Sequence, residues 1–257
     1  MTTAENRTPL NGLRLIVLRP ASELRRLARQ VAQAGGTLIS APVLHRRLLL
    51  NQVTAQRLHQ AARAELCLFT SRFAVEAASR QINLSEFRGI QLAVGPGTAA
   101  ALQAAGARRV QHPQQQASSE ALLAMPALQG AADVWLLGGV GGRGLIDSEL
   151  AAQGCRVQRI DLYQRVARKL AAPRRQALLA LPSPPLLAIS SIDALIAWLQ
   201  DPELAAISRH WPLLASSQRI AAALAERQLP IATVARSAQP DDLLMAALAY
   251  AKQAPFR

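Results

Sequence analysis

The sequence predicts an α/β protein with two domains, each built on a parallel sheet. Short apolar runs, of the kind that parallel sheets bury on both faces, alternate with amphipathic segments along the chain. Residues 65–78 align without gaps on 185–198, and 93–106 align on 215–228, which indicates an internal repeat. At 257 residues the chain is long enough for two domains. We therefore expect two domains of similar plan.

The first half of the chain shows this alternation clearly. Its first strand, Leu13 to Leu18, is an unbroken apolar run, and the helix after it is predicted to end at Gly35 because glycine is common where helices stop. Ser118 is a predicted helix cap, with Glu120 as a first-turn acid. The predicted strands are 13–18, 37–42, 65–69, 90–94 and 109–110, and the predicted helices are 24–34, 73–80, 98–106 and 120–125.

Residues 132–165 contain an apolar run, a loop with five glycines, an amphipathic segment and a second apolar run, which is the order of a βαβ unit. Two interpretations compete. Gly139, Gly141 and Gly144 fit a dinucleotide fingerprint, with Asp161 about 20 residues further on as its ribose-binding acid. The same loop also fits a small-ligand cleft lined by backbone amides, with Tyr163 at its edge. As an i, i+2 pair on a strand, Asp161 and Tyr163 are expected on one face.

The second half repeats the plan. A basic segment containing Pro173 follows Arg165, and Pro240 with two aspartates is expected to open the last helix. The predicted strands are 186–189, 211–215 and 231–235, and the predicted helices are 192–199, 220–228 and 243–251.

Composition narrows the classes of function. The formal net charge is +13, and it comes almost entirely from arginine, which fits either a GC-rich bacterial genome or a polyanionic ligand. We expect no nucleic acid partner, because the arginines are scattered and only 4% of residues are aromatic. The four histidines are isolated, which argues against a metal site.

Localisation is expected to be cytoplasmic. Cys67 and Cys155 lie far apart inside apolar runs, which fits free thiols in a reducing compartment. The first 11 residues lack the apolar centre of a signal peptide, and no apolar run reaches the roughly 18 residues that span a bilayer. We expect no membrane association.

Motifs from Leu13 to Ala249 resemble the uroporphyrinogen-III synthase family of tetrapyrrole cyclases. They are Arg19-Pro20, Thr70-Ser71, Val94-Gly95-x-Gly97-Thr98, Ser119-Glu120, Gly139-x-Gly141-Gly142-Arg143, Tyr163-x-Arg165, Ser190-Ser191, Ser217-x-Arg219 and Asp242-x-Leu244. Three positions depart from the family pattern. Leu18 replaces a hydroxyl residue, Gly138 replaces an arginine, and Phe73 replaces an asparagine or arginine.

The resemblance implies two Rossmann-like parallel-sheet domains of similar plan joined by a two-segment crossover. One domain would hold residues 1–42 plus 166–257 and the other 44–164, with crossings at 43–47 and 165–170. The implied enzyme is a monomeric, cofactor-free hydro-lyase. It would convert the linear tetrapyrrole hydroxymethylbilane to uroporphyrinogen III, losing water and inverting ring D through a spiro intermediate, in a cleft between the two domains.

The site predicted from this resemblance consists of turns that present amides to the eight carboxylates of the substrate, because helix N-termini bind anions. Tyr163 is the candidate general acid, since a phenol keeps a proton to donate at neutral pH; the alternative is a strand-end tyrosine with a surface hydroxyl. The predicted substrate-binding residues are Arg19, Pro20, Thr70, Ser71, Arg72, Gly95, Gly97, Thr98, Gly141, Gly142, Arg143, Ser190, Ser191, Ser217 and Arg219.

Simpler roles compete at several of these positions. The arginines among them could pair with substrate propionates or be merely solvated, and Thr98 could cap its helix. Two other functions also remain open at this point. One is an NAD-dependent oxidoreductase that uses the Gly139-Gly141-Gly144 fingerprint, and the other is a non-catalytic two-domain protein that binds an anion.

Overall fold

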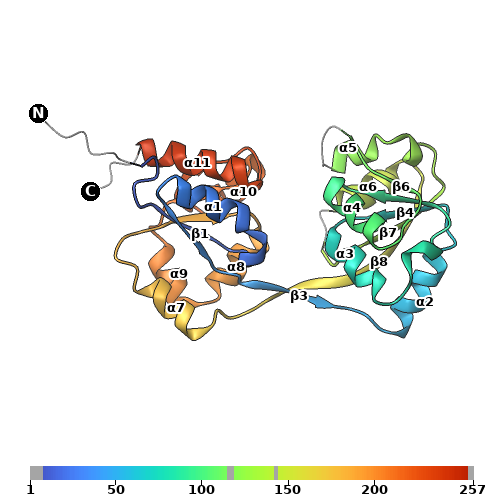
Figure 1. Ribbon diagram of the computed structural model, residues 1–257, viewed down its shortest axis with the longest axis horizontal. Helices are drawn as coiled ribbons and strands as arrows, with labels where there is room; N and C mark the ends of the chain where they lie inside the picture. Colours follow the sequence, from blue (N-terminus) through green and yellow to red (C-terminus); the bar gives the residue numbers. More distant parts are fainter. Residues whose placement is uncertain (1–7, 115–118, 142–143, 254–257) are drawn as a thin grey trace, which may run out of the picture. The chain divides into compact units, whose positions relative to one another are not determined.

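The computed structural model describes residues 8–114, 119–141 and 144–253. The chain divides into two compact units (Figure 1). Unit 1 comprises Met1–His45 and Ala167–Arg257, and unit 2 comprises Arg46–Val166. The predicted cap Ser118 lies outside the described residues. Within the described ranges, no helix has both the length and the apolar character needed to cross a bilayer.

Unit 1 is built on a five-stranded sheet in the order β11-β10-β9-β1-β2, and every pair of neighbours is parallel. The strands are β1 (Arg14–Val17), β2 (Thr37–Ser40), β9 (Leu186–Ile189), β10 (Leu213–Ala215) and β11 (Ile231–Val234). Leu15 of β1 pairs with Leu38 on one side and Leu186 on the other. The centre of this sheet is therefore formed by strands from the two separate segments of unit 1.

Helices cover both faces of this sheet (Figure 1). On one face α1 and α11 pack against Leu15, Val17 and Leu186, while α7, α8, α9 and α10 pack on the opposite face against Ile16 and Leu187. The helices are α1 (Arg25–Gln33), α7 (Ala172–Leu179), α8 (Ile192–Leu199), α9 (Pro202–Ser208), α10 (Gln218–Ala225) and α11 (Pro240–Gln253). A short 3-10 turn, Ala21–Glu23, precedes α1. Leucine, isoleucine and valine make up most of the two buried clusters, one on each face of this sheet, as a composition with few aromatics requires.

An ion pair on the α7–α9 side of unit 1 makes stability depend on pH. The Arg175 guanidinium donates to both Asp201 carboxylate oxygens, at 2.6 and 3.1 Å, and these hydrogen bonds hold the Asp201 pKa below its ordinary value. Backbone N–H groups of α9 also donate to this carboxylate. A lowered pKa in the folded state means that the stabilisation is complete above the unfolded value, about 3.9, and is lost as pH falls through the folded value.

We expect Asp201→Asn to lower the midpoint of thermal unfolding at pH 7, because it removes the charge while asparagine still caps α9. The difference from wild type should shrink as pH falls below about 4, because Asp201 of the unfolded chain is then protonated, and it should vanish as pH falls through the lowered pKa of the folded state. Thermal unfolding of both proteins between pH 7 and pH 3 measures it. A difference that stays constant across this range would contradict the assignment of the ion pair.

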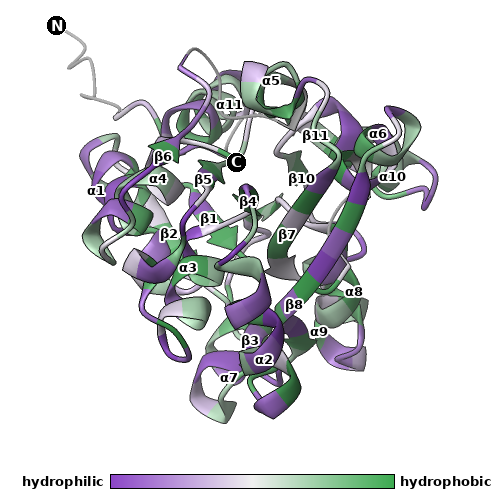
Figure 2. Ribbon diagram, turned by 90° about the vertical axis from the view of Figure 1, so that its right-hand side faces the viewer, coloured by the Kyte–Doolittle hydropathy of each residue, from purple (hydrophilic) through white to green (hydrophobic). Residues whose placement is uncertain are grey.

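Unit 2 is built on a six-stranded sheet in the order β3-β8-β7-β4-β5-β6. The pairs β8–β7, β7–β4, β4–β5 and β5–β6 are parallel. The strands are β3 (Leu44–Leu48), β4 (Leu66–Phe69), β5 (Ile90–Ala93), β6 (Val110–Gln111), β7 (Asp133–Gly139) and β8 (Arg156–Ala167). Hydrophilic and hydrophobic residues appear as bands along β8, whereas the core of β7 is mostly hydrophobic (Figure 2). This matches the central place of β7 in the sheet.

Helices also cover both faces of the unit 2 sheet. One face packs against α2 (Gln52–Ala61), α3 (Arg72–Ser79) and α4 (Pro96–Ala104), and the other packs against α5 (Ser119–Leu123) and α6 (Leu145–Ala152). Without β3, the strand order β8-β7-β4-β5-β6 corresponds to the order β2-β1-β9-β10-β11 of unit 1. The prediction of two α/β domains of similar plan is confirmed.

Four elements differ from the sequence prediction. The helices α2 and α9 were not predicted, although Asn51 and Asp201 cap them through side-chain oxygens. Residues 44–48, which overlap the predicted crossing at 43–47 and were not predicted as a strand, form strand β3 beside β8. The β8 strand also continues beyond Tyr163 to Ala167.

Candidate functional site

Three neighbouring strands of unit 2 end at the same edge of the sheet in the turns that the sequence singles out. β4 leads to Thr70 and Ser71, β5 leads to Gly95, and β7 leads to the glycine-rich turn. These strands are parallel, so their carboxyl ends lie together, which is where open α/β sheets bind ligands. The turns after β4 and β5 each open a helix, so backbone N–H groups face outward at this edge. Gly142 and Arg143 lie outside the described residues, as does the Glu120 side chain.

Tyr163 is buried among these turns and is not a surface tyrosine. Its side chain is 5% exposed, and its hydroxyl lies 3.1 Å from the Ser71 hydroxyl. The Phe73 ring packs edge-on against it, with 4.8 Å between ring centroids. Ser71 also caps α3 by accepting a hydrogen bond from Ala74 N at 3.1 Å. Ser71 therefore both starts a helix and orients the Tyr163 hydroxyl.

The expectation that Asp161 and Tyr163 share one face of β8 is wrong. The pairing of β8 with β7 shifts between Gly138 and Gly139, so that Asp161 pairs with Gly138 while Tyr163 pairs with Gly139. Leu162 is the extra residue of this bulge. Tyr163 consequently joins the core cluster that contains Ile160 and Leu162, on the α3 side of the sheet. Strict alternation along the strand could not reveal this.

Asp161 is already engaged by another side chain. Arg159 Nε donates to Asp161 Oδ1 at 2.7 Å. A dinucleotide site would need this carboxylate for the ribose hydroxyls. The ion pair therefore argues against the dinucleotide interpretation of the glycine-rich turn.

Arg72, the first residue of α3, lies beside Gly97 at the start of α4. A Cβ atom at Gly97 would lie 3.6 Å from Arg72 Cδ, so the arginine side chain passes over the start of α4. Gly95 is the N-cap residue of α4, and Thr98 lies within the first turn with 6% exposure. Thr98 therefore does not cap this helix.

The Thr70 hydroxyl, after β4, donates to Leu137 O at 3.3 Å and fills the space where a Gly138 side chain would begin.

Unit 1 carries a similar edge. Arg19, after β1, donates to the Ser190 hydroxyl after β9 at 3.0 Å and to Ala238 O at 3.3 Å. Pro20 precedes the 3-10 turn, and Ser191 is the N-cap residue of α8 without a side-chain capping bond. Ser217 caps α10 by accepting a hydrogen bond from Ile220 N at 3.3 Å, and Arg219 is exposed in the first turn of that helix.

Sequence reasoning missed Ser40 at this edge of unit 1. Its hydroxyl donates to Arg19 O at 2.7 Å, and its side chain is buried. The available signal was a serine at the end of a short strand whose two central residues are apolar. Ser40 holds the Arg19 backbone at the point where the chain leaves β1.

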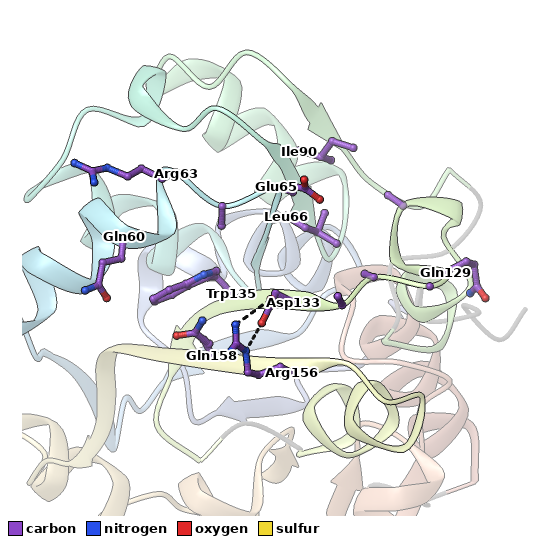
Figure 3. Close-up of a pocket in the computed structure, with 15 residues that line it drawn as sticks. Gln60, Arg63, Glu65, Leu66, Ile90, Gln129, Asp133, Trp135, Arg156 and Gln158 are labelled. Atoms are coloured by element: carbon purple, nitrogen blue, oxygen red, sulfur yellow. Dashed lines mark hydrogen bonds and ion pairs between the residues drawn. The ribbon is translucent and has the colours of Figure 1, made fainter.

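A pocket of about 620 Å³ lies at the opposite edge of the unit 2 sheet (Figure 3). It is lined by the first residues of β4, β5, β7 and β8, which are Leu66, Ile90, Asp133 and Arg156. Arg156 and Asp133 form a two-pronged ion pair at its wall. The pocket is therefore separate from the turns at the carboxyl ends of the strands.

Metal ligands do not gather in the described ranges: no three histidine, cysteine, aspartate or glutamate side chains are grouped to hold an ion. What gathers instead are amide-presenting turns, hydroxyl groups and arginines at the carboxyl ends of parallel strands. This is an arrangement with which α/β proteins can bind anionic small molecules through main-chain amides.

Comparison with known proteins identifies the family. The family model "Uroporphyrinogen-III synthase HemD" matches residues 25–245, and the chain belongs to this family. A uroporphyrinogen-III synthase from Escherichia coli is 34% identical over 119 residues, which are 44% of this chain and 48% of that protein. The aligned chain thus spans about half the length of this relative.

Solved structures share the fold. A uroporphyrinogen III synthase variant from Thermus thermophilus has a TM-score of 0.59 at 20% identity, covering 95% of this chain and all of that one. A uroporphyrinogen-III synthetase from Helicobacter pylori has a TM-score of 0.63 at 14% identity, covering 92% of this chain and 99% of the other. The predicted α/β fold class is confirmed.

Proposed function

We propose that this protein converts hydroxymethylbilane to uroporphyrinogen III, with loss of water and inversion of ring D. The observation that carries the proposal is the family match over residues 25–245. The turns at the carboxyl ends of β1, β4, β5, β7, β9 and β10 support it, because they fall where the family motifs were found in the sequence. The named E. coli and T. thermophilus relatives are synthases of this product.

In the proposed complex, carboxylates of the substrate accept hydrogen bonds from main-chain amides after Thr70, Gly95 and Ser190. Arg19, Arg72 and Arg219 add positive charge near the same strand ends, and the net charge of +13 attracts a polyanion. Uncatalysed closure of the substrate gives the uninverted isomer. The main task of the protein is therefore to hold one folded conformer, an effect worth several kcal/mol.

Tyr163 is the proposed general acid. The ring-A hydroxyl would leave as water after taking the phenolic proton, and the azafulvene left behind would be attacked by ring D to give the spiro intermediate. The hydrogen bond between the Ser71 and Tyr163 hydroxyls supports this role because it fixes the position of the phenol oxygen. The spiro intermediate then fragments and recloses with ring D reversed, which needs no cofactor because the overall change is the loss of water.

We expect Tyr163→Phe to slow turnover by roughly tenfold to a hundredfold without abolishing it, since positioning by the amides persists. Ring packing against Phe73 is retained in this variant, so the free energy of unfolding should change little. Tyr250→Phe is a matched control, because Tyr250 lies on α11 of unit 1 and so outside the unit that contains Tyr163. A Tyr163→Phe protein with wild-type turnover would remove Tyr163 from the mechanism.

The decisive assay supplies the purified protein with freshly prepared hydroxymethylbilane. Products are oxidised and the type I and type III isomers are separated chromatographically. We expect type III to dominate. Type I alone, formed at the spontaneous rate, would overturn the proposed function, and micromolar saturation by NADH in a fluorescence titration would favour an oxidoreductase.

We further propose that the functional domains are residues 1–42 plus 166–257 and residues 44–164. We propose a monomer located in the cytoplasm that acts without a nucleic acid partner. The free, buried thiols of Cys67 and Cys155 support a reducing compartment. Burial raises the pKa of the Cys67 thiol to about 12, which keeps it protonated and unreactive.

A further inference from the structure

One arginine of β8 joins three elements of unit 2 at the glycine-rich turn. Arg159 Nε donates to Asp161 Oδ1 at 2.7 Å, Nη1 donates to Asp147 Oδ2 at 2.7 Å, and Nη2 donates to Gly139 O at 2.6 Å. Asp147 lies in the first turn of α6, and Gly139 is the last residue of β7. All three nitrogens of the planar guanidinium are used, which no other side chain could achieve.

The start of the turn is fixed by two hydrogen bonds to a single peptide group. Its carbonyl oxygen, on Gly139, accepts from Arg159, and its N–H, on Val140, donates to Tyr163 O at 2.8 Å. A peptide group is planar, so holding both of its polar atoms fixes its orientation. The direction in which the chain leaves β7 is thereby set, and it is tied to the strand residue that carries the candidate general acid.

The end of the turn is held by the same guanidinium. Gly144 precedes α6 with φ +68° and provides no side-chain cap, so α6 begins without the capping hydroxyl that α3 has. Asp147 instead connects the first turn of α6 to Arg159. Both ends of the turn are therefore attached to one side chain.

The charges make this attachment strong. The Arg159, Asp147 and Asp161 side chains are 27%, 34% and 36% exposed, so solvent screens them only partly. Partial burial alone would lower the pKa of the Arg159 guanidinium, but hydrogen bonds and charge from Asp161 and Asp147 outweigh burial and raise it. Charge-assisted hydrogen bonds of this kind are about twice as strong as neutral ones.

We propose that Arg159 is a positioning residue of the proposed cyclase, holding the two ends of the glycine-rich turn and the adjacent Tyr163 segment in one geometry. The inference rests on the proposed function and extends it to a residue outside the predicted site. Without Arg159 the Gly139–Val140 peptide and the start of α6 would adopt several geometries. The substrate would then bind more weakly, and more of it would close spontaneously without inversion of ring D.

The test compares Arg159→Met with Arg156→Met. Arg156 lies on the same strand and pairs with Asp133 of β7, but at the amino ends of these strands. We expect Arg159→Met to raise KM roughly tenfold or more and to increase the fraction of type I product, because small misplacements in such sites are costly. Arg156→Met should keep the wild-type KM and isomer ratio. Arg159→Lys should fail to rescue, since an ammonium lacks the planar fork.

The outcomes separate the two proposals. A wild-type protein that forms no type III isomer overturns the proposed function. A wild-type protein that forms it, together with a folded Arg159→Met variant of unchanged KM and isomer ratio, overturns the role of Arg159 alone. If Arg159→Met does not fold, Asp147→Asn and Asp161→Asn take its place. Each removes one partner and should raise KM by a smaller factor, and wild-type KM in both would equally overturn the inference.

Discussion

Gly89→Ala is expected to unfold unit 2 under conditions in which the wild-type protein is folded. A Cβ atom at Gly89 would lie 2.1 Å from the Glu65 carbonyl oxygen and 2.3 Å from that of Ala64. Both are backbone atoms, and Glu65 O already accepts from Ile90 N at 2.8 Å, so neither can rotate away. The start of β5 would have to separate from the start of β4. We expect a loss above about 3 kcal/mol, at the upper end for overpacking.

Chemical denaturation followed by circular dichroism measures this loss, and hydrogen exchange of the β4 and β5 amides locates it. Gly97→Ala is the matched control, because its nearest neighbour would be Arg72 Cδ at 3.6 Å, an ordinary contact. We expect this control to change the free energy of unfolding by less than about 1 kcal/mol. A Gly89→Ala protein as stable as the control would show that the starts of β4 and β5 separate at little cost.

Gly139→Ala is expected to damage the site itself. The new Cβ atom would lie 2.6 Å from Tyr163 Cε2 and 2.7 Å from Cζ. Phe73 and Ser71 hold the buried Tyr163 ring on its other sides, so the ring must move and lose its bond to Ser71. We expect turnover to fall roughly tenfold to a hundredfold. Stability should fall by about 1–3 kcal/mol.

A double-mutant cycle with Tyr163→Ala tests the cause. If the alanine at position 139 acts by pushing the tyrosine ring, its cost in free energy of unfolding should largely disappear once that ring is absent. Costs that simply add would contradict the steric explanation. The rate of type III formation is measured only in the Gly139→Ala variant, because Tyr163→Ala removes the proposed general acid.

Much of the fold could be predicted because its signals are local. Residues 186–189 and 192–199 form β9 and α8 with the predicted bounds, since a short apolar run, two serines and an amphipathic segment follow one another directly. Strand β3 could not be predicted in this way. It reads LHRRL, its three central residues are exposed, and it is a strand because β8 lies beside it. That partner is more than a hundred residues away in the sequence.

The site was predictable where it depends on turns and unpredictable where it depends on contacts through space. Glycines and hydroxyl residues after apolar runs indicated the strand ends correctly. Arg159 and Asp147 carry no local signal, because their importance comes from the meeting of β7, β8 and α6. The bulge at Leu162 was equally hidden, since nothing in the residues 161–163 indicates that the pairing with β7 shifts there.

The interrupted sequence of unit 1 has a consequence for biosynthesis. β1 and β2 leave the ribosome first, but β1 needs β9 as its second neighbour, and all of unit 2 is synthesised in between. Unit 2 is contiguous, so we expect it to fold as a unit before β9 is synthesised. In the folded unit Leu49 N donates to Leu162 O at 2.9 Å, near the two ends of that unit. Folding of unit 2 thereby shortens the flexible chain between β1 and β9. Less conformational entropy is then lost when these two strands pair. Substitutions that slow the folding of unit 2 should therefore also delay unit 1.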